Sequence, residues 1–164
     1  ILLNANGYLL PYLDVPLGDK HFKVYQRIGS TGILRGRGVN SGWSNQTWFD
    51  IDSILHTEEL ASGLKDFYPQ FTPDMSSPTF AILESIKLLF ELIKNQDIQT
   101  SAESIDHLIQ QVSTQWGEWG LNDFQLDRDI TRKEFAILTD TLVDPFNTVD
   151  VDIRGNISSR KTIY

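Results

Sequence analysis

Apolar residues recur at helical spacing in five separate segments of this chain. A face of one helix gathers positions three and four residues apart, so such spacing indicates an amphipathic helix. The five predicted helices run from about 19 to 32, 57 to 68, 79 to 94, 100 to 117 and 131 to 144. The third has the widest apolar stripe, and we expect it to be the central helix of the core. That stripe comprises Ile82, Ile86, Leu89, Phe90 and Ile93.

Several helix ends are marked by residues suited to them. Thr100 with Glu103, and Thr131 with Glu134, have the Ser/Thr-x-x-Glu spacing of a capping box, which predicts helix starts at 100 and 131. Proline cannot continue a helix, so Pro145 ends the fifth one. Along the outer side of the third helix, Glu84, Lys87 and Glu91 are spaced to form ion pairs.

The remaining segments have no helical pattern. Residues 1–16 are mostly apolar but broken by Gly and Pro, which predicts an extended lead-in packed on a neighbouring surface. Residues 35–52 are rich in Gly, Asn and Ser and contain two Trp, which we interpret as a long loop. Residues 149–157 alternate like a short strand. The predicted fold class is therefore all-α, one domain over 1–164 with a short extended C-terminal segment.

The chain also indicates an internal repeat. Shifting the sequence by 75 residues places LHTEELA (55–61) on ITRKEFA (130–136) without a gap. Each half then has the order helix, Gly-containing loop, aromatic residue, acidic turn and helix. A helical hairpin cannot bury its apolar face alone, so two such units are expected to pack together. We predict repeat one over about 14–68 and repeat two over about 74–146.

Composition narrows the function classes. The chain has 14 Lys and Arg against 22 Asp and Glu, a net charge of −8, which argues against a nucleic-acid partner. There is no Cys, so disulfides, thiolate metal sites and cysteine nucleophiles are excluded. The longest apolar stretch, 80–93, is interrupted by charges and too short to span a membrane. The chain begins with Ile1 rather than Met, and we expect it to be a fragment of a larger protein.

Three stretches resemble S-layer homology repeats: LDVPLGDKHFKVYQRIGSTGILRGRG, WFDIDSILHTEELA and FQLDRDITRKEFA. The resemblance lies in an acidic DVP start, a first helix, a GIL turn and a second helix opened by a TRAE-like motif. It implies helical modules that associate with cell-envelope glycan through the motif's Arg and a Trp. Arg132 is the Arg of that motif here, whereas the first repeat has His56-Thr57. By this resemblance the protein would be located in the cell envelope, the periplasm or outside the cell.

A narrower resemblance is to the C-terminal region of large bacterial FAD-dependent oxidoreductases. It rests on the blocks GYLLPYLDVP, QRIGSTGILRG, GWSNQTWF and TRKEFAILTDTLVDPF, in that order. It implies that a flavin-binding catalytic domain precedes this chain in the same polypeptide and holds the FAD. Within the chain, Gly36 and Gly38 give only G-x-G without the third Gly of a dinucleotide fingerprint, so we predict no cofactor here.

The leading hypothesis is therefore a non-catalytic accessory domain that packs against or positions the preceding catalytic domain. The alternative is a carbohydrate-binding module with a polysaccharide ligand. Trp43 and Trp48 flank Asn45 and Gln46, and indoles with neighbouring amides are typical of sugar recognition. Together with Phe49, the same two Trp could instead pin the loop onto the helices or onto a neighbouring domain outside this chain. A third hypothesis, that the chain is itself an enzyme, stays open.

Arg132 completes the candidate binding residues. A cation in the first turn of a helix is disfavoured by the helix dipole unless an anion lies nearby. Its partner is expected to be Asp127, Asp129 or another acid, or else an anionic ligand. No catalytic residue and no metal ligand is predicted, because the three His are scattered and the acid pairs lack the spacing of a calcium loop.

Overall fold

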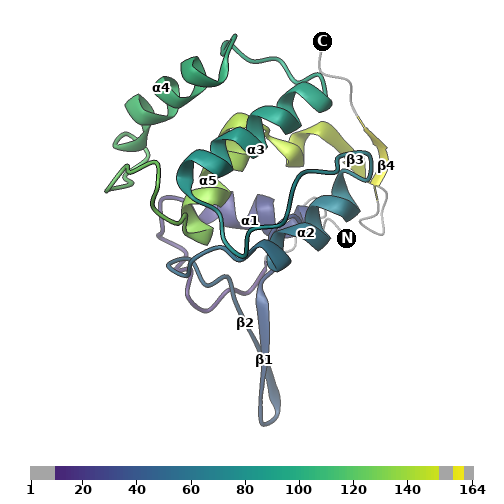
Figure 1. The fold of residues 1–164 in the computed structure, drawn as a ribbon. Helices are drawn as coiled ribbons and strands as arrows, with labels where there is room; N and C mark the ends of the chain where they lie inside the picture. The colour runs from purple at the N-terminus through teal and green to yellow at the C-terminus, as the bar shows by residue number, and fades with distance from the viewer. Residues whose placement is uncertain (1–9, 152–156, 161–164) are drawn as a thin grey trace.

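The computed structural model describes residues 10–151 and 157–160 of the chain. Over those residues the structure contains five α-helices, two antiparallel strand pairs and one 3₁₀ helix (Figure 1). The helices are α1 (Phe22–Thr31), α2 (Thr57–Phe67), α3 (Ile82–Asn95), α4 (Ile105–Trp116) and α5 (Arg132–Leu142). The strands are β1 (Arg37–Ser41), β2 (Ser44–Trp48), β3 (Val149–Val151) and β4 (Ile157–Arg160), and η2 (Pro145–Thr148) connects α5 to β3.

The all-α prediction is wrong, because the structure is mixed, although helix-rich. The segment 35–52, interpreted as a loop, contains the antiparallel pair β1 and β2. Gly42 has a φ of 60°, so a two-residue turn can join the strands without steric strain. Gly42 at the first turn position was the available sequence signal of a hairpin. At the other end, Val149–Val151 forms β3, whereas residues 152–156 of the predicted strand lie outside the described residues.

The fourth helix begins later than predicted. Its N-cap is Ser104, whose hydroxyl accepts a hydrogen bond from the backbone N–H of His107 at 3.2 Å. Thr100 instead accepts a bond from the N–H of Ala102, two residues on, so it closes a local turn. The capping box predicted for the fifth helix is confirmed, because Thr131 and Glu134 each accept a bond from the other's backbone N–H, at 3.2 and 2.8 Å.

Three helices start at one place in the molecule. The extended residues that precede α2, α3 and α5 pair in a ring of short antiparallel bridges. In each bridge, the residue two positions before one N-cap pairs with the N-cap of another helix. The bridged pairs are Ile54 with Thr131, Asp129 with Ala81, and Thr79 with His56. The 75-residue offset of the predicted repeat aligns the N-caps His56 and Thr131. Ala81, the N-cap of α3, is a third equivalent helix start, and that offset does not predict it.

A single apolar cluster fills the space between the helices. The predicted stripe of α3 faces it, with Ile82, Ile86, Leu89 and Ile93 buried and Phe90 partly buried. Helix α5 packs on α1 and α3, and Arg27 of α1 donates from Nε to the buried Asp140 carboxylate of α5 at 2.8 Å. No helix among the described residues is long and apolar enough to cross a membrane. Residues 1–9, which make up most of the predicted lead-in, lie outside the described part of the chain.

Candidate functional site

The β1–β2 hairpin projects from the helical body as a separate arm (Figure 1). No residue from Gly38 to Phe49 carries a formal charge, although the whole chain carries 36 charged side chains. The two charged residues that flank this segment neutralise each other, because Arg37 donates to the Asp50 carboxylate at 2.8 and 3.1 Å. This bidentate pair also holds the pKa of Asp50 below its usual value. The hairpin is therefore a neutral surface on an acidic protein.

Trp43 occupies the tip of the hairpin. The turn consists of Gly42 and Trp43 between the paired residues Ser41 and Ser44. The Trp43 side chain is 108% exposed relative to a reference residue, so no described part of the chain covers the indole. Trp has the largest apolar side chain and usually buries most of it, which makes a fully exposed indole at a projecting tip an unusual feature.

The strand register separates the predicted binding residues. Gln46 pairs with Val39 and Trp48 pairs with Arg37, so these side chains lie on one face of the hairpin. Asn45 pairs with Asn40 and lies on the opposite face. Trp43 and Trp48 are five residues apart, or roughly 17 Å along an extended strand. One sugar ring cannot contact both indoles at that separation.

Arg132 is not on the hairpin surface at all. Its side chain is 3% exposed and its guanidinium lies at the base of the hairpin. Nε donates to the Phe49 carbonyl at 2.7 Å and Nη2 donates to the Arg35 carbonyl at 2.6 Å, so the group joins the residues just after β2 and just before β1. The expected anionic partner is neither Asp127 nor Asp129 but Glu59, with Nη1 3.3 Å from its carboxylate.

Further contacts fix the base of the hairpin. The Asp14 carboxylate accepts bonds from the N–H groups of Phe49 and Ile51, at 2.8 and 3.1 Å. Leu13 N–H donates to the Thr47 carbonyl at 2.9 Å, which adds a short third chain segment beside β2. The Phe49 ring is buried between Tyr12 and Tyr25, with 5.1 Å between ring centroids in both pairs. The hairpin is thus held at its base by several contacts with the helical body, while the Trp43 indole at its tip is fully exposed.

The other two Trp do not contribute to this site. Trp116 is buried in α4, where its indole N–H donates to the Asn122 carbonyl at 2.9 Å. Trp119 is partly buried three residues later. Figure 1 places α4 at the end of the molecule away from the hairpin. Comparison with protein-family models, with curated protein sequences and with solved structures found no match to this chain.

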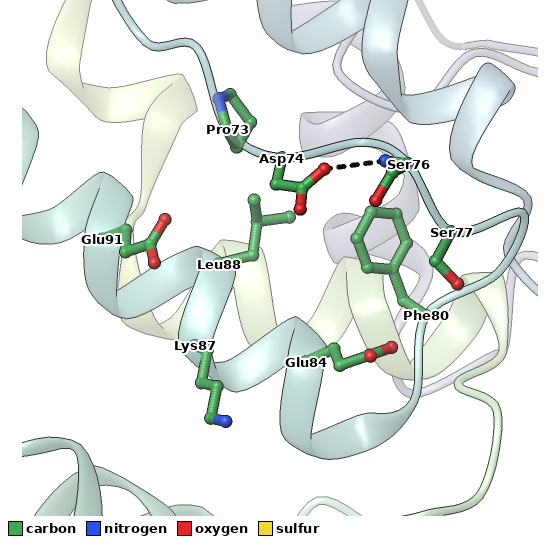
Figure 2. A pocket seen from close by; sticks show the side chains of 9 residues that line it. All are labelled: Pro73, Asp74, Ser76, Ser77, Phe80, Glu84, Lys87, Leu88 and Glu91. Atoms are coloured by element: carbon green, nitrogen blue, oxygen red, sulfur yellow. Dashed lines mark hydrogen bonds between the residues drawn. The ribbon is translucent and has the colours of Figure 1, made fainter.

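A second candidate site was missed by the sequence reasoning. The segment 73–77 runs alongside α3 and leaves a groove of about 300 Å³ between them, which we call the α3 groove (Figure 2). Its lining residues are Pro73, Asp74, Ser76, Ser77, Phe80, Glu84, Lys87, Leu88 and Glu91. Glu84, Lys87 and Glu91 were expected to form ion pairs on a solvated helix face. Among the described residues no ion pair within 4.0 Å involves any of the three.

No three His, Asp or Glu side chains within the described ranges are grouped closely enough to hold a metal ion. The acid pairs whose spacing fails the calcium-loop pattern are Asp50 with Asp52 and Asp127 with Asp129. One member of each pair binds a protein group: Asp50 pairs with Arg37, and Asp129 accepts a hydrogen bond from the Thr79 hydroxyl at 3.1 Å. These carboxylates stabilise turns and the ring of bridges between the helix starts.

Proposed function

We propose that this chain is a non-catalytic accessory domain that docks onto a neighbouring protein domain through the β1–β2 hairpin, with the Trp43 indole as its main contact. The observation that carries the proposal is the full exposure of Trp43 at the tip of a projecting, uncharged arm. By the resemblance of the sequence, the neighbour is the FAD-binding catalytic domain of the same polypeptide.

The physical argument rests on the free energy of transfer out of water. Burying an indole removes a large apolar area from water. Trp is also among the residues that most often dominate the binding energy of protein interfaces. The exposed side-chain amides of Asn40 and Asn45 near the tip can form hydrogen bonds at the rim of such a contact. No charge on residues 38–49 needs to be desolvated, which removes the largest cost of burying a polar surface.

The rigid base of the hairpin supports the same function. Binding through a flexible arm would require its ordering, which weakens affinity. Here Arg132 and Asp14 already hold the two ends of the hairpin through four hydrogen bonds to the backbone of residues 35, 49 and 51. The conformational entropy lost in orienting the arm is therefore lost on folding rather than on binding.

A photo-crosslinking residue in place of Trp43, within the intact polypeptide that carries this chain, tests the proposal. We expect irradiation to join position 43 to the flavin-binding domain, with the crosslinked peptide located by mass spectrometry. The matched control places the same residue at Glu118, an exposed position beyond α4, where we expect no such product. Crosslinking of both positions to the same extent, or of position 43 only to proteins without flavin, would contradict the proposal.

Carbohydrate binding is the second candidate, favoured by Gln46 and Trp48 on one face of the hairpin. Both are partly exposed, so an amide and an indole face are available together. The distance between the two Trp requires an extended glycan rather than a single sugar. If this function is correct, a polysaccharide will shift the Trp fluorescence of the protein, and Trp48→Ala will abolish the shift. Fluorescence that stays unchanged at millimolar concentrations of sugar would exclude it.

A further inference from the structure

β1 is the open edge of the hairpin. The Leu13 N–H donates to the Thr47 carbonyl from the outer side of β2, so this carbonyl points away from β1. In an antiparallel pair, two residues directly opposite each other either exchange hydrogen bonds or both direct their backbone groups outward. Gly38 lies opposite Thr47, so its N–H and C=O groups point away from β2, as do those of Asn40 two residues on. No other segment within the described ranges bonds to these groups.

Other features of β1 also leave this edge accessible. Residues 37–40 are all exposed, whereas residues 46–48 of β2 are partly buried. A Cβ added at Gly38 would meet no other atom within 4 Å. Proteins usually protect an unpaired edge with Pro, with charged side chains or with a bulge. β1 contains no Pro, pairs with β2 in a continuous register, and carries one charge, on Arg37, which Asp50 neutralises. The edge is therefore open to pairing with another extended segment.

The side chains of the hairpin indicate the chemistry of such a segment. Val39 is 36% exposed and lies on the same face as Trp48, which is its diagonal neighbour on β2. A strand beside β1 would continue this face with every second side chain. An apolar side chain opposite Val39 would remove the exposed part of the valine from water. The segment that fits this edge is therefore extended and has an apolar residue between polar ones.

We propose that the neighbouring domain adds an extended segment to the outer edge of β1, as a third strand of the hairpin sheet. This inference rests on the proposed docking through Trp43 and specifies its backbone contacts. The N–H and C=O groups of Gly38 and Asn40 bond to the added strand, and an apolar side chain of that strand packs on Val39. Trp43, three residues beyond Asn40, lies at the end of the same contact. A second copy of the chain is a poorer partner, because it carries the same net charge of −8.

Amide hydrogen exchange in the intact polypeptide tests this mode of docking, because the two edges of the hairpin are compared in one sample. We expect the N–H groups of Gly38 and Asn40 to exchange about tenfold or more slowly than in an unstructured chain. Asn45, opposite Asn40, directs its N–H to the other edge and is expected to exchange at the unstructured rate. The Val39 N–H belongs to the β1–β2 ladder, so its protection reports that the hairpin is formed.

Asn40→Pro and Asn45→Pro form a matched pair of variants. Each removes an outward N–H, one from either edge, and a strand accepts Pro where the N–H takes no part in the ladder. We expect Asn40→Pro to abolish the protection of Gly38 and to lower crosslinking from position 43 at least threefold, roughly the effect of one lost hydrogen bond. Asn45→Pro should change neither, and Val39 should stay protected in both variants.

The outcomes separate strand addition from docking itself. Equal exchange at Asn40 and Asn45, in a polypeptide whose position 43 crosslinks to the flavin-binding domain, would overturn strand addition and leave the proposed docking intact. Absence of that crosslink would contradict the docking, and strand addition with it. Protection of Gly38 and Asn40 that falls on dilution would identify a second copy of the chain as the partner and would also overturn the proposal.

Discussion

Replacing Arg132 by alanine is expected to lower the free energy of unfolding by about 3 kcal/mol, measured by urea denaturation. The guanidinium is almost completely buried and donates to the Phe49 and Arg35 carbonyls, while Glu59 supplies its counter-charge. Loss of the side chain leaves both carbonyls without this hydrogen-bond donor. It also removes a cation–π contact, in which the guanidinium carbon Cζ lies 5.3 Å from the centre of the Phe49 ring. Glu59 is 38% exposed and stays hydrated, which limits the loss.

The matched control for this variant is Arg35→Ala. Arg35 has the same side chain, but its guanidinium is 56% exposed and pairs with the exposed Asp66. Its carbonyl, which receives the bond from Arg132, remains after substitution. A loss below about 1 kcal/mol is expected, as for other surface ion pairs. Equal losses for the two variants would show that Arg132 does not hold the base of the hairpin.

Gly63→Ala is expected to lower the free energy of unfolding by about 2 kcal/mol in the same measurement. In an exposed helix this change would stabilise the protein, because alanine has the higher helix propensity by about 1 kcal/mol. Here a Cβ at position 63 would lie 2.3 Å from the Ile33 carbonyl oxygen and 2.4 Å from that of Gly32. Both atoms belong to the backbone after α1 and cannot rotate away, so α2 would have to move.

Gly18→Ala provides the comparison for this prediction. A Cβ at Gly18 would have no neighbour within 4 Å, and the residue does not have a positive φ. Its stability is expected to stay within about 0.5 kcal/mol of the original chain. If Gly63→Ala proved as stable as Gly18→Ala, the close approach of α2 to the 32–33 backbone would be excluded.

The helices were largely predictable from the sequence, because their evidence is local. The apolar faces of the five helices and the Thr131–Glu134 capping box depend on residues within a few positions of one another. The hairpin was missed because its local signal was weak. Gly42 favours a tight turn, but neither flanking run, RGVNS or SNQTW, alternates between apolar and polar residues, and the Gly, Asn and Ser content favoured a loop. The backbone pairing of β1 with β2 decided the structure of this segment rather than a hydrophobic pattern.

The position of each candidate binding residue depended on structure that was not predicted. Asn45 and Gln46 are adjacent in sequence, and because they belong to a strand rather than a loop, their side chains lie on opposite faces of the hairpin. Arg132 was expected to pair with Asp127, Asp129 or another acid, or to contact an anionic ligand. It pairs with Glu59 and also donates to backbone carbonyls 97 and 83 residues away, at the base of the hairpin.

By itself, the sequence determined the apolar helix faces, the acidic charge of the protein and the neutral segment from Gly38 to Phe49. Each of these is a property of residue order and needs no partner. Only the tertiary structure decided that the neutral segment projects with Trp43 at its tip, that Arg132 is a buried support, and that the 73–77 segment closes a groove over α3. These features arise where segments far apart in the chain are brought together, and the free energy that joins them comes from core packing rather than from local preference.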